Sequence, residues 1–195
     1  MKKWMNAVCV LMLVLSVTGC SPAFDPSITS MYVQKDGKVT YAVVESFEKE
    51  YYSLDEFQDM IEKEVEISNS NYSEPAISVE RLEVKDDTLY LLMEFANAEA
   101  YEGYSEEYCF IGSVSDALDE GRAFNMTFKD ADYKEYTTAE VTAKKENQVL
   151  VLQKEGVVEL EGTIKYVSNN VEVLSEHMVQ IMPIEDKEEY AYIIY

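Results

Sequence analysis

Alternating apolar and polar positions dominate the body of the chain and predict strands from its beginning. Two such runs, residues 28–34 and 38–47, flank the pair Asp36-Gly37. Asp-Gly between two strand-like runs is a strong signal for a tight hairpin turn. The apolar residues that share one face of the second run are Val39, Tyr41, Val43 and Phe47. The pattern therefore predicts an antiparallel hairpin with one buried face.

A second hairpin is predicted between residues 77–85 and 88–96, around Asp86-Asp87. The apolar residues that recur at every second position of its second strand are Leu89, Leu91, Met93 and Phe95. This two-residue period places them on one face of the strand, and we expect that face to pack against a core.

The second half of the chain predicts mostly strands. Residues 97–107 are polar and tyrosine-rich, and we expect a loop there. A strand at 108–114 and a short helical turn at 115–120, stopped by Gly121, follow it. The remaining apolar runs predict a meander with strands at 124–129, 136–144, 149–154, 157–167, 171–174, 178–182 and 190–195.

One segment between the two hairpins has a helical period instead. Ser53 and Glu56 form the pattern of a capping box, in which the serine accepts a hydrogen bond from the backbone of the third helical residue. The apolar residues that follow at spacings of three and four are Leu54, Phe57, Ile61 and Val65. These signals predict an amphipathic helix over residues 54–67 that packs on the sheet through this stripe.

The order of these elements favours an α+β fold. We expect mainly antiparallel β-sheet, made of hairpins and a meander, with one packed amphipathic helix at residues 54–67. Neither a low-complexity tract nor a long linker divides residues 28–195, so one domain with a large antiparallel sheet is predicted. Two subdomains that meet near residues 130–134 are the alternative.

The first twenty residues have a different pattern. Lys2 and Lys3 precede an apolar run at residues 7–15, and small residues follow it. A positive patch, a short apolar core and a cut site with small residues form a secretory signal. The apolar run is too short to cross a bilayer comfortably, since a spanning helix needs about 20 apolar residues.

The segment Val17-Thr18-Gly19-Cys20 resembles the bacterial lipobox, at which a cysteine is lipidated and becomes the new N-terminus. The resemblance implies a signal peptide at residues 1–19, a lipidated Cys20 with a short linker through residue 27, and a domain at 28–195. It also implies that the protein is anchored by lipid at the extracytoplasmic face of the cell membrane. An ordinary signal peptide or an uncleaved anchor is the alternative. The mature region resembles, in type and not in motif, the small surface lipoproteins of Gram-positive anaerobes.

The charge of the chain limits its partners. It has 38 acidic against 16 basic residues and a formal net charge of −22 at pH 7. Such a balance argues against nucleic acid, because affinity for nucleic acid rests on cationic contacts to phosphate. It also disfavours a domain that lies flat on anionic lipid. Cations, basic proteins and neutral sugars remain as candidate partners besides the membrane.

The cysteines provide few candidates for a disulfide or for catalysis. Cys9 would leave with the signal and Cys20 would carry lipid, so Cys109 is the remaining thiol and the domain can form no internal disulfide. Cys109 and His177 could make a nucleophile and its base. Nothing in the sequence brings them together, and we expect neither catalysis at this pair nor a cofactor.

Tyrosines are the least ordinary feature of the composition: the chain has 15, against 7 Phe and 1 Trp. Tyr101, Tyr104 and Tyr108 fall in or next to the predicted loop at 97–107. Exposed tyrosines give flat, rigid contact surfaces suited to proteins and sugars. We therefore take these three residues as a possible binding patch for a protein or glycan ligand.

Acidic clusters are weak candidates for a metal site. Asp130, Asp132 and Glu135 place three carboxylates in six residues, and calcium prefers clustered oxygen ligands. The segment lacks the glycine and the final glutamate of an EF-hand loop. Clusters of this kind arise readily in so acidic a chain, so solvated loops without metal are the expectation.

These observations favour a membrane-anchored, non-enzymatic binding or interaction module. The first alternative is a carbohydrate-active hydrolase of the cell envelope, or a sugar-binding accessory, that uses surface carboxylates and tyrosines. The second is an accessory subunit of a membrane complex, which the short linker favours. A glycosidase needs two carboxyl groups about 5–10 Å apart, which the sequence cannot nominate.

The lipid anchor can be tested with a single substitution. Cys20→Ala should leave the precursor unprocessed or release the protein from the membrane, because the acceptor of the lipid is lost. Fractionation of cells into membrane and soluble material measures this. Cys9→Ala, in the segment expected to be removed, is the matched control and should remain anchored. Unchanged membrane attachment of Cys20→Ala would refute the assignment.

Overall fold

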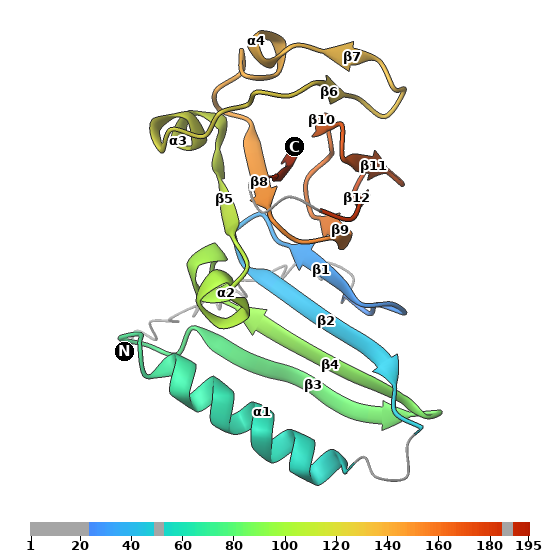
Figure 1. Cartoon of the computed structure of the whole chain (residues 1–195). Coiled ribbons are helices and arrows are strands. Elements are labelled where there is room, and N and C mark those ends of the chain that lie inside the picture. The colour runs from blue at the N-terminus through green and yellow to red at the C-terminus, as the bar shows by residue number, and fades with distance from the viewer. Residues whose placement is uncertain (1–23, 49–52, 185–188) are drawn as a thin grey trace, which may run out of the picture.

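The computed structural model describes residues 24–48, 53–184 and 189–195. Within these ranges the strands form two sheets, and helices connect or cover them (Figure 1). Antiparallel pairing predominates in both sheets. The predicted α+β class with mainly antiparallel sheet is therefore confirmed.

The first sheet has the strand order β11-β12-β9-β1-β2-β4-β3. Its neighbouring strands are antiparallel, except that β1 and β9 run parallel. The strands and their bounds are β1 Ser30–Val33, β2 Val39–Ser46, β3 Ile77–Lys85, β4 Thr88–Phe95, β9 Gly156–Leu160, β11 Val171–Val173 and β12 Met178–Ile181. Both predicted hairpins lie here, since β1 pairs with β2 and β3 with β4.

The second sheet has the strand order β5-β8-β13-β10-β6-β7 and is antiparallel throughout the described residues. Its strands are β5 Cys109–Ser113, β6 Phe128–Lys129, β7 Glu135–Tyr136, β8 Gln148–Leu152, β10 Tyr166–Ser168 and β13 Ala191–Ile194. The prediction of one large antiparallel sheet is thus wrong. The predicted strand at 157–167 divides into β9 of the first sheet and β10 of the second. The residues between them carry the chain from one sheet to the other.

The predicted amphipathic helix is confirmed as α1, Leu54–Asn69. Its N-cap is Ser53, whose Oγ accepts a hydrogen bond of 3.3 Å from the backbone N–H of Glu56. Ile61 is buried, and Phe57 and Val65 pack against the same core. The helix lies along β3 (Figure 1), so its apolar stripe covers the edge of the first sheet.

The predicted loop at 97–107 is wrong, because residues Ala98–Ser105 form the helix α2. The Asn97 side chain caps it by accepting a hydrogen bond of 2.9 Å from the backbone N–H of Ala100. The helix ends at Glu106, whose φ of 60° is left-handed. Ala100 and Tyr101 are buried, and the polar residues on either side of them hide this short helix in the sequence.

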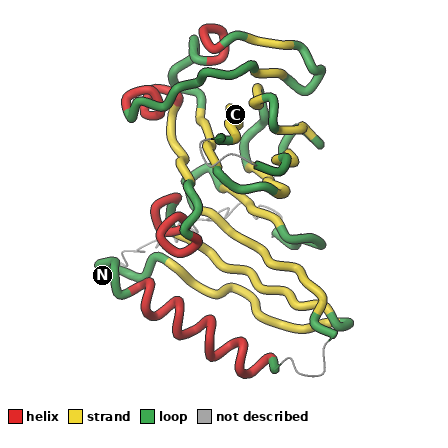
Figure 2. Tube along the Cα trace, viewed as in Figure 1, coloured by secondary structure: helices red, strands yellow, loops and turns green. Residues whose placement is uncertain are grey.

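Two shorter helices complete the fold. The predicted helical turn at 115–120 is confirmed as α3, Val114–Asp119. Residues Thr138–Val141 form α4, so the predicted strand at 136–144 is wrong (Figure 2). A capping box between Thr137 and Glu140 starts that turn. No helix of the described residues is long and apolar enough to cross a membrane.

The central strands β8 and β13 are buried on both faces. Leu150, Leu152, Ala191 and Ile193 point into the larger core, which they share with both hairpins of the first sheet and with α1 and α2. The alternate residues that point into the smaller core, against α3 and the segment before β6, are Val149, Val151, Tyr192 and Ile194. The two cores therefore lie on opposite faces of β8 and β13. Through the larger core, these two strands pack the second sheet against the first.

The chain begins its described part packed on the first sheet. The Phe24 ring stacks on the ring of Tyr32, with centroids 5.1 Å apart, and an Arg81 N–H donates to Asp25 Oδ1 over 2.8 Å. Phe24 and Asp25, expected to be part of a linker, therefore contact β1 and β3. Cys20 and the signal segment lie outside the described residues.

The shared core gives a stability test. Ile193→Ala should lower the free energy of unfolding by about 2–5 kcal/mol, because Ile193 is fully buried between the sheets and leaves a cavity. Ile67→Ala on α1, where the side chain is 58% exposed, should change it by less than about 0.5 kcal/mol. Urea unfolding followed by circular dichroism measures both. Equal effects would contradict the described packing.

Candidate functional site: a groove along β5

A groove of about 840 Å³ runs between α2 and the strand β5. The turn between β1 and β2 contributes Asp36 to its wall, and the segment after α3 contributes Glu120 and Arg122. Figure 1 shows α2 beside the start of β5, where the two sheets meet. We call this feature the β5 groove; its floor is the segment from Tyr108 to Ile111.

β5 is an edge strand, and its register shows which backbone groups are unpaired. The Gln153 N–H donates to the Tyr108 carbonyl over 3.2 Å, and the Val114 N–H to the Asn147 carbonyl over 2.8 Å. In an antiparallel ladder, bonded residues alternate with residues whose N–H and C=O groups point the other way.

The backbone groups of Cys109 and Ile111 therefore point away from β8, and both residues line the groove. Among the described residues, no hydrogen bond takes up these two N–H groups. An unpaired strand edge of this kind is a template for pairing with another chain. Ile111 is partly exposed, whereas Cys109 is 4% exposed and Ser113, the next residue that faces away from β8, donates its N–H to Asp116 Oδ2. The accessible unpaired backbone groups of this edge therefore lie at Ile111.

The other sheet edges of the described residues are less suited to pairing. β3 has a register irregularity between Val79 and Arg81, and such bulges disrupt a ladder. β11 has only 3 residues and β7 only 2. Short or irregular edges are common protections against unwanted strand addition. β5 therefore differs from the other edges of the described residues in having a regular ladder beside a groove, with its accessible edge at Ile111.

Acidic side chains surround the groove. Asp36, Glu99, Glu102 and Glu120 line it, together with one cation, Arg122. Glu99 and Glu102 are exposed on the outer side of α2. Carboxylates on the wall of a concave surface concentrate cations near it, because the walls focus the field. The groove is therefore a cation-attracting surface.

Arg122 lies at one end of the groove, stacked on aromatic rings. Its guanidinium carbon is 4.1 Å from the centroid of Tyr108 and 5.9 Å from that of Tyr190. Its buried Nε has no hydrogen-bond partner, and Glu120 Oε2 is 3.9 Å away. Burial raises the pKa of Tyr108 to about 12, although the nearby Arg122 opposes that shift. This end of the groove is thus a rigid cation–aromatic platform.

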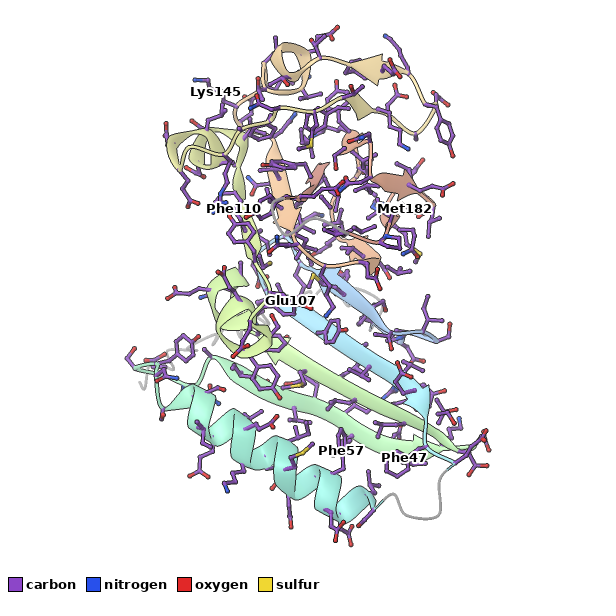
Figure 3. The ribbon with its side chains drawn as sticks, viewed as in Figure 1. Phe47, Phe57, Glu107, Phe110, Lys145 and Met182 are labelled. Carbon is purple, nitrogen blue, oxygen red and sulfur yellow. The ribbon has the colours of Figure 1, made fainter. Side chains whose placement is uncertain are left out.

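A polar cluster below the groove fixes the turn between α2 and β5. Lys154 Nζ is 2.6 Å from Glu107 Oε2, and the Tyr101 hydroxyl donates to the same oxygen over 3.1 Å. Lys154 Nζ also lies 4.9 Å from the ring centroid of Tyr41 on β2. Figure 3 labels Glu107 in this turn. The cluster joins β2, the turn and the end of β8, and so sets the position of the groove.

Burial and the carboxylate of Glu107 together set the pKa values of Lys154 and Tyr101. Burial alone would lower the pKa of Lys154, but the hydrogen bond to Glu107 and the neighbouring charges outweigh it and raise the pKa. Burial, with Glu107 next in importance, raises the pKa of Tyr101 well above its usual range. The Glu107 carboxylate therefore stabilises both the charged Lys154 ammonium and the neutral Tyr101 phenol.

The predicted tyrosine patch is dispersed by the structure. Tyr101 is 1% exposed and belongs to the core, so its expected exposure is wrong. Tyr104 is half-buried against Phe95, and its hydroxyl donates to Glu64 Oε2 over 3.3 Å. Only Tyr108 of the three lines the β5 groove. The three rings therefore do not form one exposed surface.

Cys109 lies on a strand of the second sheet, whereas His177 lies in the turn between β11 and β12 of the first. Cys109 is buried on β5, and burial raises its pKa to about 12, which opposes formation of a thiolate. His177 precedes β12, where its Nδ1 lies 2.9 Å from the carbonyl oxygen of Gly162. The described structure therefore does not assemble this pair.

Of the three weak metal candidates, Asp130 uses its carboxylate to stabilise a turn. Asp130 Oδ1 accepts from the backbone N–H groups of Asp132 and Lys134, and Oδ2 accepts from the Tyr136 hydroxyl over 2.8 Å. Glu135 is exposed on β7. Within the described residues, no group of three or more His, Cys, Asp or Glu side chains could hold a metal ion.

Sequence reasoning missed most of the groove. Phe110 and Arg122 belong to no recognisable sequence motif. Glu99 and Glu102 lie in residues 97–107, which the sequence predicts to be a loop. The Asn97 cap before Ala100 and Tyr101 was the one available signal that this segment is a helix. Figure 3 shows Phe110 on β5, above the Glu107 turn.

Comparisons with protein-family models, with curated proteins and with solved structures find no match to this chain. Any functional assignment therefore rests on its own residues and their arrangement. The β5 groove combines an unpaired edge, a concave surface and a concentrated charge, and so is the strongest candidate site of the described residues.

The polar cluster can be tested by removing one charge. Glu107→Gln should lower the free energy of unfolding by about 1–3 kcal/mol, because Lys154 and Tyr101 lose their charged acceptor. Glu106→Gln, at the exposed neighbouring residue, removes the same charge and should cost less than about 0.5 kcal/mol. Urea unfolding compares the two. A similar loss in both variants would show that overall charge, and not this contact, is responsible.

Proposed function

We propose that this chain is a lipid-anchored binding module of the extracytoplasmic membrane face and that it binds its ligand in the β5 groove. The single observation that carries the proposal is the regular, unpaired edge of β5 inside a groove of about 840 Å³. Binding sites are characteristically concave surfaces with a few fixed polar groups, and this groove has that composition.

The polar groups of the groove are held in place before any ligand arrives. The Glu107–Lys154 pair fixes the turn that leads into β5, and the ladder with β8 fixes the strand itself. Preorganised groups lose less conformational entropy on binding, which favours affinity. A rigid groove of this kind supports recognition as the primary activity.

The carboxyl groups favour binding over hydrolysis. In the described residues, the carboxyl groups with clearly shifted pKa values are Asp116, Asp130 and Glu140. Hydrogen bonds from caps and turns lower all three. A glycosidase needs the opposite, a carboxylic acid whose pKa is raised so that it can donate a proton.

The proposed anchor places the groove near the membrane. Cys20 precedes Phe24 by four residues, which reach at most about 14 Å when fully extended. Phe24 and Asp25 are packed on the first sheet, so the domain has little free tether. The net charge of −22 keeps it from lying on anionic lipid. Ligands in the envelope, and extracytoplasmic parts of membrane proteins, would be within reach.

Crosslinking in intact cells tests the groove as the binding site. A photoreactive phenylalanine at Phe110, which lines the groove, should give a discrete crosslinked product. The same residue at Met60, 46% exposed on α1, is the control and should give none. Digestion of the product with protease or with glycosidases identifies a protein or a glycan. Failure of position 110 to crosslink above the control would overturn the proposal.

A further inference from the structure

The unpaired groups of β5 have the spacing of a strand that lacks a neighbour. Cys109 and Ile111 are two positions apart, which is about 6.8 Å along a strand at ~3.4 Å per residue. Their N–H and C=O groups point away from β8 on the side of the groove, where Ile111 is partly exposed and Cys109 is covered. An extended chain in the groove would present its own donors and acceptors at the same interval. Strand addition of this kind is a recurring mode of peptide recognition.

The opposite wall has charges at a matching interval. Glu99 and Glu102 are three residues apart on α2, so their side chains lie on one face of that helix, with Cβ atoms roughly 5–6 Å apart. Side chains on one face of an added strand recur every ~6.8 Å. Two cationic side chains of an extended segment can therefore meet these two carboxylates, while its backbone pairs with β5.

Charge complementarity selects the occupant. The groove is lined by four carboxylates and one guanidinium, and that guanidinium is stacked on Tyr108. A second copy of this chain, with a net charge of −22, would be repelled. A neutral glycan can hydrogen-bond to these groups through its hydroxyls, but it has no positive charge to balance the four carboxylates and no amides at the interval of a strand. A cationic polypeptide satisfies both sets of groups.

We infer that the β5 groove binds an extended, lysine- or arginine-rich segment of a partner protein, which adds to β5 as a further strand. The inference rests on the proposed function and deepens it. The backbone of β5 provides the pairing, Glu99 and Glu102 select positive side chains, and Arg122 with Tyr108 closes one end of the site.

A competing role for the acidic wall is protection. Charged residues beside an edge strand keep it from pairing with other copies of the chain. Under that role, neutralising the wall would cause self-association, and basic peptides would not bind. The two roles therefore predict different results for the same variants.

The experiment uses the full-length protein in mild detergent and a fluorescent peptide that alternates lysine with valine or threonine. Fluorescence anisotropy should detect binding that weakens as salt increases, because the contacts are exposed ion pairs. An acidic peptide, with glutamate in place of each lysine, should bind at least about tenfold more weakly because like charges oppose it. Equal binding of the two peptides would overturn the inference.

Backbone pairing is tested at Ile111. Ile111→Pro removes the outward N–H but keeps the ladder with β8, and proline is tolerated on an edge strand. Ile111→Ala keeps the N–H and removes part of the same side chain. The alanine variant should bind the lysine peptide about tenfold more tightly than the proline variant, since one backbone hydrogen bond and the fit of the strand are lost. Equal affinities would show that the peptide does not add as a strand.

A second measurement keeps the pairing test decisive if Ile111→Pro does not fold. The lysine peptide can be N-methylated at alternate positions, which removes the N–H groups along one of its edges. One of the two methylation patterns should abolish most binding to the unmodified protein and the other should not. Equal binding of both patterns would overturn strand addition.

The charge selection is tested with two matched triple variants. Glu99→Gln, Glu102→Gln and Glu120→Gln together should weaken binding of the lysine peptide about tenfold, through the loss of the ion pairs at Glu99 and Glu102 and of the negative charge at Glu120. The control removes three exposed charges elsewhere, with the substitutions Glu45→Gln, Glu62→Gln and Glu66→Gln. Equal weakening would assign the effect to net charge and overturn the selection by the groove. Self-association of the first variant without peptide binding by the unmodified protein would establish the protective role instead.

These outcomes are separable from those of the proposed function. Crosslinking from Phe110 to a glycan, together with no peptide binding, would overturn the inference and leave the groove as a binding site. No crosslinking from Phe110 would overturn the proposed function itself. Crosslinking to a protein whose contacted segment is acidic or helical would overturn the inference alone.

Discussion

Burial of β8 and β13 on both faces is the constraint on which the rest of the structure depends. Val149 and Val151 point into one core while Leu150 and Leu152 point into the other. A strand with apolar side chains on both faces needs other elements packed against each face, because exposing either face to water is unfavourable in free energy. The first sheet with α1 and α2 supplies one cover. The helix α3 and the Phe124–Phe128 segment supply the other.

This arrangement explains why the groove lies where it does. β5 pairs with β8, so it stands at the edge of the twice-covered sheet and next to the helix α2 that covers the first sheet. The chain reaches β5 through the Glu107 turn, which Lys154 at the end of β8 holds in place. The open edge is therefore a consequence of how the two sheets are joined.

Local signals anticipated much of the fold. The Asp36-Gly37 and Asp86-Asp87 turns have backbone conformations that the sequence itself favours, with φ of 88° at Gly37 and of 49° and 59° at the two aspartates. Ser53 caps α1, and its stripe is buried through Ile61. Where the local signal was weak, prediction failed. Residues 136–144 have alternating polarity, yet a capping box at Thr137 turns the chain into α4.

The sequence by itself determined the class of fold, the strand-rich pattern, the first helix and the acidic charge, because these depend on periodicity and composition within short segments. It also predicts the lipid anchor at Cys20. Only the tertiary structure decided that 157–167 divides between two sheets and that Tyr101 is buried. It also decided that Arg122 stacks on Tyr108 beside the open edge of β5. These features depend on which strands become neighbours, and contacts between residues far apart in the chain set that order.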